Sequence, residues 1–452
     1  MDHLSRRRLL GAGTVGLAAA ATLSATRVHA AQAPVWDRAH RRAQAQPIVD
    51  YLAANGAKLL REPQGAIALP SISPSLPGKE YSAQLWDWDT LWTSTALFKL
   101  ADFMADPAFS ARLTRHVEGS LLTFFQHQRR EGRIPLVINP VMPPDGGLRM
   151  DAPNHQNQAK PVFGQLALLL ADRTGSAEFL RPHFEPLLRF YESWYLGNMS
   201  KPGLFVWGDD VCIGNDNDPT TYGRPYFSSA NLLLNCLFYQ DLGAALTLAQ
   251  RLGRPAAEQA SLAARRQALG DAIQRHCWDE RDAFYYTADV QVVDRRSELL
   301  PGIPQGMATS WQVLPLRIQT FTGFLPLWCG LASPAQAARL LERNWFADDR
   351  LRGAWGVRSL GRQEPMYSMV ASGNPSNWLG PVWIIANYFV WKGLVAYGQT
   401  QAADALASDT VRLLVKSLAE TGSLNEYYHP DTGAALSHPG FMDWDMLVLE
   451  MI

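Results

Sequence analysis

Apolar residues recur at intervals of three and four positions through most of this chain, which is the spacing of one face of a helix. Gly, Pro and Asn interrupt the pattern between successive stretches, for example at Asp106-Pro107 and Gly253-Arg254-Pro255. Strand-like pieces are short and few, at residues 283–287 and 356–360. The pattern predicts helices over residues 38–56, 90–104, 108–128, 160–173, 177–196, 229–252, 255–276, 334–344, 380–397, 402–420 and 441–451.

No linker or low-complexity run divides the chain, so one nearly all-α domain of eleven or twelve helices is expected. Consecutive helices joined by short loops can form a bundle, a solenoid or a closed toroid of hairpins. The sequence contains no repeat of fixed period, and this argues against the solenoid. The stretch 377–391 is apolar almost all round, which predicts a buried helix such as the inner helix of a double-layered toroid. Asn387 and Lys392 argue against a membrane span there.

The N-terminus has the pattern of an export signal. Ser5-Arg6-Arg7-Arg8-Leu9-Leu10 matches a twin-arginine address, an Ala/Gly/Leu stretch follows, and Val28-His29-Ala30 offers small residues for cleavage. We therefore expect a twin-arginine signal peptide at residues 1–31 and one domain at 32–452. The mature protein is expected to be periplasmic or secreted, with no membrane segment after cleavage.

Composition removes several classes of function. The formal net charge of the 452 residues is −1, which gives no indication of nucleic acid as a partner. The four cysteines lack the spacing of a zinc site, and no Gly-rich nucleotide loop, metalloprotease helix motif or serine nucleophile elbow is found. We expect no metal and no cofactor. The 15 Trp and 14 Tyr residues are compatible with a small carbohydrate ligand, because exposed aromatic rings serve as platforms for sugars, although most Trp residues in any protein lie in the core.

The segment Val206–Pro225 concentrates candidate chemistry. Four carboxylates stand within ten residues there, among Gly, Asn and Pro residues that exclude regular helix or strand: Asp209, Asp210, Asp216 and Asp218. A carboxylate-rich loop ahead of a rigid helix is a common catalytic arrangement. A solvated acidic loop, or a calcium site built from carboxylate oxygens, is the alternative at this stage.

Two further segments place carboxylates beside aromatic rings. Asp87 and Asp89 begin a predicted helix between Trp86, Trp88 and Trp92, where either carboxylate is suited to bind sugar hydroxyls or to cap the helix. Glu426 lies in a turn-rich loop ahead of Tyr427, Tyr428 and His429. Burial and such neighbours can tune a Glu for general-base catalysis. An acid in the Asp216 loop and a base at Glu426 would be the minimum set for glycoside hydrolysis.

Four motifs together resemble glycoside hydrolase family 63, in the branch of mannosylglycerate hydrolase-like proteins, which are relatives of the trehalases. They appear in the family's order and run from residue 86 toward the C-terminus, and Pro439–Asp445 resembles the family's last barrel helix. The motifs are Trp86-Asp-Trp-Asp-Thr90, Gly214-Asn-Asp-Asn-Asp-Pro219, Trp378-Leu-Gly-Pro-Val-Trp-Ile-Ile-Ala-Asn-Tyr388 and Asn425-Glu-Tyr-Tyr-His-Pro-Asp-Thr-Gly433.

The resemblance implies an (α/α)6 barrel with long loops and short β-hairpins, and inverting hydrolysis of an α-linked glucoside or mannoside without a cofactor. It implies that Asp216 is the general acid and Glu426 the general base. The substrate-binding residues it implies, together with those that lie beside these motifs, are Trp86, Asp87, Trp88, Asp89, Gln158, Asp218, Arg224, Trp378, Trp383 and Tyr427.

Some features depart from the family's pattern. Many members have Glu-Ser-Gly before the catalytic Asp segment, where this chain has Val211-Cys212-Ile213-Gly214. Asp218 replaces a residue that is usually small, so Asp216 is preferred as the acid with Asp218 as the alternative. Two other functions stay open: a sugar epimerase or polysaccharide lyase that uses His or Tyr, with His155, His276 and His429 as candidates, and a non-catalytic glycan-binding protein.

Overall fold

The computed structural model describes residues 34–141, 157–291, 313–371 and 375–452. Val35–Ile452 forms one compact unit, and the following description concerns this unit alone. The predicted signal peptide at residues 1–31 lies outside the described residues, as does the candidate His155.

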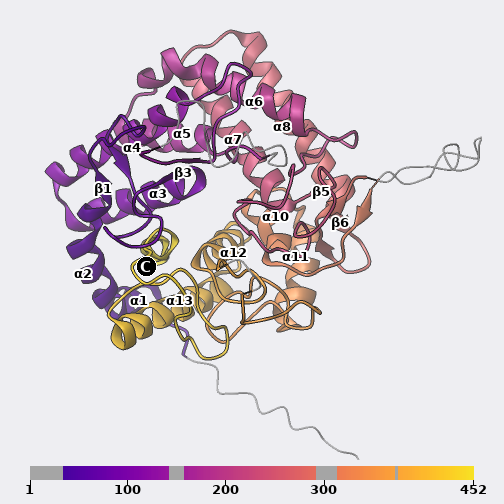
Figure 1. The fold of residues 1–452 in the computed structure, drawn as a ribbon. Helices are drawn as coiled ribbons and strands as arrows, with labels where there is room; N and C mark the ends of the chain where they lie inside the picture. The colour runs from indigo at the N-terminus through magenta and orange to yellow at the C-terminus, as the bar shows by residue number, and fades with distance from the viewer. Residues whose placement is uncertain (1–33, 142–156, 292–312, 372–374) are drawn as a thin grey trace, which may run out of the picture. The chain divides into compact units, whose positions relative to one another are not determined.

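An inner layer of helical segments forms a closed ring (Figure 1). Each segment contacts the next in chain order, and the last contacts the first, so the ring has no free edge. In chain order the inner segments are α3 (Asp87–Met104), α5 (Phe163–Thr174), α7 (Leu232–Arg251), η3 with α10 (Phe321–Phe324 and Leu325–Trp328), α12 (Ile384–Ala396), and η5 with α14 (Trp444–Leu447 and Val448–Met451).

An outer layer covers this ring. For example, α4 packs on α3 and α5, α8 packs on α7, and α13 packs on α12. The two layers make an (α/α)6 barrel, which confirms the predicted fold class. The outer helices are α1 (Arg38–Gln44), α2 (Gln46–Asn55), α4 (Pro107–Gln126), α6 (Phe184–Asn198), α8 (Ala256–Cys277), α11 (Pro334–Leu341) and α13 (Thr400–Thr421), with η1 (Gly56–Leu59), η2 (Glu178–His183) and η4 (Glu342–Phe346) beside them.

Local sequence explains where the helices begin and end. The Asp106 side chain accepts hydrogen bonds from the first backbone N–H groups of α4, and Pro107 occupies the first position, where a missing N–H costs nothing. Ser333 forms a capping box with Gln336 at the start of α11. Gly422 ends α13 in the left-handed conformation that glycine adopts without a steric penalty.

Connections differ between the two ends of the barrel. Turns from an inner helix to the next outer helix are short, as at Ala105-Asp106, whereas those from an outer to an inner helix are long. The long connections are residues 56–86, 127–162, 199–231, 278–320, 347–383 and 422–443. They carry the short strands β1 (Leu60–Arg61), β2 (Ser71–Ile72), β3 (Leu85–Trp86), β4 (Val137–Ile138), β5 (Ser229–Ala230), β6 (Trp278–Asp279), β7 (Phe284–Tyr285), β8 (Ala288–Asp289) and β9 (Leu314–Pro315).

Pairing within the first half joins neighbouring long connections. β3 pairs antiparallel with β4, which ties 56–86 to 127–162. The Asn157 side chain donates to the Asp209 carbonyl and carboxylate, at 3.1 and 2.7 Å, and so ties 127–162 to 199–231. β5 pairs with β8, and β8 with β9, so the sheet β5–β8–β9 extends this chain of contacts into 278–320.

The second half completes the circle. A bridge between Thr320 and Leu360 ties 278–320 to 347–383, and Val382 pairs with Tyr428 of 422–443. Phe441 pairs with Ser75, which returns to the first connection. The six long connections are therefore linked in a ring over one end of the barrel. All the candidate site residues lie in these connections or in the first turn of the inner helix that follows.

Each predicted helix has a helical counterpart in the structure, and one inner segment was not predicted. The inner segment η3 with α10 is missing from the prediction because it is short and changes from 3₁₀ to α at Leu325-Pro326, so no apolar periodicity develops. The predicted strand at 356–360 contributes only isolated bridges. Of the described helices, α7 is long and apolar enough to cross a membrane by length and composition, but 72% of that window is buried inside the unit, as expected for a core helix.

Candidate active site

Glu426 is the most enclosed of the predicted catalytic carboxylates. Its side chain is 2% exposed, and burial raises its pKa. The Ser376 hydroxyl donates to Oε1 at 3.1 Å, and His438 Nδ1 is hydrogen-bonded to Oε2. The His438 contact lowers the pKa, and the nearby Asp216 raises it. A buried carboxylate with both oxygens held in place is suited to general-base chemistry.

The four carboxylates of the acidic loop have different surroundings. Asp209 accepts from Asn157 and from the Val211 amide, and Asp210 accepts from the Gly223 amide at 2.7 Å. Asp218 is fully buried, and burial raises its pKa to about 6. It accepts from the Thr220 amide at 2.8 Å and from the side chains of Asn215 and Asn231. These three carboxylates hold the loop in shape.

Asp216 is the loop carboxylate that faces the base. It is half-buried, and among the four it is the one whose charge acts on both Glu426 and Tyr81. Its Oδ1 accepts from the Gly214 amide at 3.2 Å. Asn217, the next residue, accepts from the Trp378 amide at 2.6 Å and so fixes the loop against the connection that carries Ser376. The structure thus brings together two residues that are 210 positions apart in the chain.

Gly214 lets the acidic loop lie on the floor of the site. Its φ is +98°, and a Cβ at this position would stand 3.0 Å from Lys160 Cε and 3.1 Å from the Trp88 ring. A residue with a side chain would therefore be strained and would push the loop off both neighbours. The close approach sets the depth at which Asp216 enters the site.

Asp87 is occupied by structure. It is fully buried and accepts from the Trp88 amide at 2.7 Å, from the Lys160 amide at 2.7 Å, and from Lys160 Nζ at 3.1 Å. Lys160, itself 2% exposed, also donates to the Cys212 carbonyl. This buried ion pair joins α3 to two long connections and leaves Asp87 little capacity to bind a substrate.

Replacing Lys160 with Met should destabilise the fold by about 3 kcal/mol, because it leaves the Asp87 carboxylate buried without a cation. The measurement is urea unfolding of the single variants and of Lys160→Met/Asp87→Asn, in which part of the loss should return. Arg181→Ala is the control, since its pair with Glu178 is exposed to solvent and should contribute much less than the buried pair. Equal losses from Lys160→Met and Arg181→Ala would contradict the role given to the buried pair.

Asp89 has a second carboxyl as its neighbour. Burial, and then the charge of Asp87, raise its pKa to about 7, and its side chain contacts Asp443. Asp443 is fully buried, with its pKa raised by burial and by Asp89, and its Oδ1 accepts from Thr93 Oγ1 at 2.7 Å. Two carboxyls this close share a proton, because both cannot be ionised at low cost. Asp89 is 7% exposed and is the member of the pair that can reach a sugar.

The shared proton predicts a pH dependence of stability. In the folded protein Asp89 keeps its proton up to about pH 7, whereas unfolded Asp titrates near 3.8, so the stabilisation from this group is full below 3.8 and is lost as the pH rises toward 7. The melting temperature of the wild type should therefore fall more steeply between pH 5 and 7.5 than that of Asp443→Asn. The amide of this variant donates permanently to Asp89 and still accepts from Thr93. Parallel melting curves in calorimetry would show that no proton is shared.

Aromatic rings pack beneath these carboxylates. Trp378 and Trp383 are stacked, with centroids 3.9 Å apart, and the other side of Trp383 meets Tyr427 at 4.8 Å. Trp383 is fully buried, so it supports the rings around it. Tyr427 is 5% exposed and donates to the Pro375 carbonyl. Trp88 lies between Trp378 and Trp444 and is 3% exposed.

The remaining predicted binding residues come from three connections. Gln158 is 1% exposed; its Oε1 accepts from Ser193, and its Nε2 is buried without a partner among the described residues. Trp86 is half-buried and donates to Gln84. The Arg224 guanidinium forms an ion pair with Asp289, so it is already engaged by a carboxylate of the protein. Gln158 therefore has a side-chain donor without a partner among the described residues.

Sequence reasoning missed three residues of the site. Tyr81 lies among the carboxylates, since Glu426, Asp216 and Asp89 all act, after burial, to raise the pKa of its hydroxyl. His438 contacts Glu426, and Asp443 contacts Asp89. His438 could have been found from the sequence, because it follows the Glu426 motif closely in the chain. Asp443 lies in the segment Pro439–Asp445 that resembles the family's last barrel helix, which was a signal for it. Tyr81 had none, because its site partners lie hundreds of residues away or in another element.

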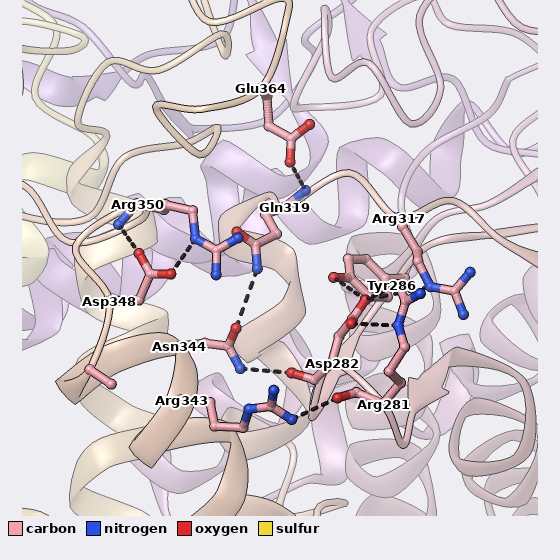
Figure 2. Close-up of a pocket in the computed structure, with 11 residues that line it drawn as sticks. Arg281, Asp282, Tyr286, Arg317, Gln319, Arg343, Asn344, Asp348, Arg350 and Glu364 are labelled. Atoms are coloured by element: carbon pink, nitrogen blue, oxygen red, sulfur yellow. Dashed lines mark hydrogen bonds and ion pairs between the residues drawn. The ribbon is translucent and has the colours of Figure 1, made fainter. Parts of the chain in front are cut away.

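A polar pocket of about 560 Å³ lies elsewhere on the long connections (Figure 2). Four Arg residues line it together with carboxylates and amides, and none of its described lining residues is a predicted site residue. Their charges are largely satisfied within the wall: Arg317 pairs with Asp279, and Arg350 with Asp348. Asn344 and Gln319 bond to each other, as the dashed lines in Figure 2 show. The pocket is thus separate from the carboxylate site.

The calcium alternative and the histidines named for a lyase or epimerase find little support in the described residues. No group of three or more His, Cys, Asp or Glu is arranged there to hold a metal ion. His276 lies on the outer helix α8, away from the carboxylates. His429 Nδ1 accepts from the backbone amide of Asp431 at a turn.

An (α/α)6 barrel that presents two carboxylates from facing connections, above a floor of aromatic rings, defines a glycoside hydrolase. The profile of the mannosylglycerate hydrolase MGH1-like glycoside hydrolase domain matches residues 82–442, and the chain belongs to this family. This confirms the resemblance to family 63 found in the four motifs.

Individual relatives agree with the family. Mannosylglycerate hydrolase MGH1 of Selaginella moellendorffii is 36% identical over 125 residues, covering 27% of this chain and 22% of the relative. Mannosylglycerate hydrolase of Thermus thermophilus is 30% identical over 142 residues, covering 30% and 31%. The matched part of the chain thus spans about a fifth to a third of the length of these relatives.

Solved structures share the fold over most of the chain. GH63 mannosylglycerate hydrolase from Thermus thermophilus, in complex with glucose, superposes with a TM-score of 0.63 at 19% identity, covering 90% of this chain and 99% of that one. Neutral trehalase Nth1 from Saccharomyces cerevisiae gives 0.56 at 14% identity, covering 85% and 74%. The fold relation to trehalases is confirmed.

Proposed function

We propose that this protein is an exported, inverting glycoside hydrolase that cleaves an α-linked glucoside or mannoside in a small oligosaccharide or glycoconjugate. The observation that carries the proposal is the approach of Asp216 to the buried Glu426, on connections from different parts of the barrel. The relatives named as mannosylglycerate hydrolases make an α-mannosyl group on a glycerate the first substrate to test.

In the proposed reaction the two carboxylates work on opposite faces of the sugar. Asp216 gives its proton to the glycosidic oxygen as the bond from this oxygen to the anomeric carbon breaks. A water molecule forms the new bond to that carbon, and Glu426 accepts the proton that the water loses. Ser376 and His438 hold the Glu426 carboxylate during this step. The products are a sugar with inverted configuration and a leaving group that carries the Asp216 proton on its hydroxyl. Asp216 is left ionised and Glu426 protonated by the water, and exchange with solvent restores both.

The bound sugar would rest among the aromatic rings, with Asp89 and Gln158 as hydrogen-bond partners of its hydroxyls. Asp89 offers a carboxylate that shares a proton with Asp443, and Gln158 offers Nε2. Asp87, Asp218 and Trp383 keep supporting roles, because their polar atoms or faces are already engaged.

The test is hydrolysis followed by proton NMR. Purified protein is incubated with mannosylglycerate, glucosylglycerate and α-linked disaccharides, and the first anomer released is recorded before mutarotation. Immediate appearance of the β-anomer supports the proposal. Initial release of the α-anomer would establish a retaining mechanism and refute the general-base role of Glu426. Absence of release from all of these substrates would count against an α-glycosidase of this type.

Export depends on the twin-arginine pair. Changing Arg6 and Arg7 to Lys should keep the full-length protein in the cytoplasm, because the export machinery reads the two guanidinium groups as an address. Cell fractionation with antibody detection measures this. The same change at Arg42 and Arg61 is the control and should leave export intact. Export of the double lysine variant at the wild-type level would contradict the proposed route.

A further inference from the structure

We infer that His438 is a positioning residue for the proposed general base, holding the Glu426 carboxylate in the orientation needed to bind and deprotonate water. This inference rests on the proposed function, and it assigns a role to a residue outside the predicted site. Its support comes from the contact itself, from the backbone of His438 and from the ring that buttresses it.

The contact fixes one of the two oxygens of the base. His438 Nδ1 is hydrogen-bonded to Oε2 of Glu426, while the Ser376 hydroxyl donates to Oε1. A carboxylate oxygen has two acceptor sites, so each oxygen keeps one for another donor. With a donor on each oxygen, the carboxylate cannot rotate about its last bond without losing a hydrogen bond in a buried place.

A hairpin delivers His438 to this position. Glu426 donates from its amide to the Ser437 carbonyl at 3.0 Å, and Leu436 donates to the Tyr427 carbonyl at 3.1 Å. The segments before and after the turn therefore run side by side, and the residue that follows Ser437 lies opposite the base. Trp444 fixes the same segment by donating to the Glu426 carbonyl at 3.0 Å.

The backbone of His438 is strained. Its φ is +44°, in the left-handed region that residues with a side chain seldom adopt. Such strain persists where the surroundings impose it and is common at functional sites. Glycine would fit this conformation at no cost, so the imidazole is present in spite of the backbone. Relief of this strain gives a way to separate function from stability.

Tyr81 buttresses the imidazole. Its ring meets the His438 ring edge-on with centroids 5.4 Å apart, and it also contacts Trp86 and Phe441 edge-on. The Tyr81 backbone is left-handed as well, with a φ of +63°. The His438 side chain is 20% exposed, so one edge of the ring faces solvent while Nδ1 faces the base. The Glu426 contact also raises the pKa of His438, with Glu80 adding to the effect.

Two substitutions at one position provide the kinetic test. His438→Gly removes both the donor and the strain, so the melting temperature should stay equal or rise while kcat falls about 100-fold with KM nearly unchanged, as expected when a reacting group is misplaced. His438→Asn places an amide N–H where Nδ1 stood and tolerates the left-handed backbone, so kcat should stay within about tenfold of the wild type. A structural role for His438 would predict the opposite order, with Gly as the benign change.

The matched control is Ala105→Gly. Ala105 is exposed, has a φ of +50° and ends α3 at the opposite end of the barrel from the site. This change should raise stability through relief of strain and leave kcat unchanged. Wild-type kcat in His438→Gly, or equal losses in the Gly and Asn variants, would overturn the inference.

A second measurement needs no substrate. NMR titration of the His438 imidazole, assigned by the loss of its signal in His438→Asn, should give a pKa above the ordinary histidine value in the wild type and a clearly lower one in Glu426→Gln. An unchanged titration would overturn the inference even if the enzyme is active. If the titration shifts but no α-glycoside is hydrolysed, the proposed function fails and the Glu426–His438 contact stands.

Discussion

Glu426→Gln is expected to lower kcat by about 10³-fold or more, because the amide cannot accept a proton from the attacking water. The change replaces one oxygen by a nitrogen of the same size at a site that is 2% exposed, so packing is preserved. Gln can also accept from Ser376 through its oxygen. The measurement is the initial rate on the substrate identified in the NMR screen, with KM determined in parallel.

The fold of this variant should survive. Burial of the charged carboxylate is unfavourable, which is why the pKa of Glu426 is raised. The neutral amide does not carry this cost, so the melting temperature should not fall. Glu420→Gln is the control, since Glu420 is half-exposed and pairs with Lys416 on the outer helix α13. A Glu426→Gln variant with a kcat near that of the wild type would remove Glu426 from the mechanism, whatever the fate of Asp216.

Asp216→Asn and Asp218→Asn are expected to fail in different ways. The Asp216 change removes the proton that the leaving group needs, so kcat should fall about 10³-fold with little effect on melting. Asp218 accepts three hydrogen bonds, from the Thr220 amide on one oxygen and from the Asn215 and Asn231 side chains on the other. An Asn at this position must turn its own N–H₂ group toward one of these sets of donors and so lose hydrogen bonds. We expect a loss of about 1–3 kcal/mol in stability.

A substrate with a better leaving group separates these effects. Because a nitrophenolate needs no proton to depart, Asp216→Asn should recover most of its rate on a nitrophenyl α-glycoside, whereas Asp218→Asn should not change its ratio to the wild type. The reverse result, with rescue of Asp218→Asn alone, would make Asp218 the acid and Asp216 the loop carboxylate.

The hydrophobic pattern was sufficient to predict one nearly all-α domain with a buried helix at α12, but it left a bundle, a solenoid and a toroid open. The barrel itself was predicted from the resemblance of the four motifs to family 63. The inner segment η3 with α10 was missed because eight residues split between two helix types leave no period to detect. Helix boundaries were predictable where a cap marks them, as Asp106 does. Where the connection is irregular, as before Asp87, the predicted start lies several residues from the observed one.

For the site, composition and motifs pointed to loops whose carboxylates lie close together in the structure, and they left open which carboxylate has which role. Asp87 and Asp89 look alike in sequence, and what separates them is Lys160, which is 73 residues from Asp87. Asp216 and Asp218 differ in the same way, through the donors that surround Asp218. These partners are distant in sequence and can be identified only in the folded structure. The same is true of the place of Tyr81 among the carboxylates.

Because every long connection precedes an inner helix, the inner helices all begin at the end of the barrel that holds the site. Each helix start carries a partial positive charge from its aligned peptide dipoles, worth about 0.3–1 kcal/mol to a nearby anion. The barrel therefore aims a ring of positive helix ends at its densest group of buried acids, including Asp87 and Asp89 in the first turn of α3. This field offsets part of the cost of burying these acids.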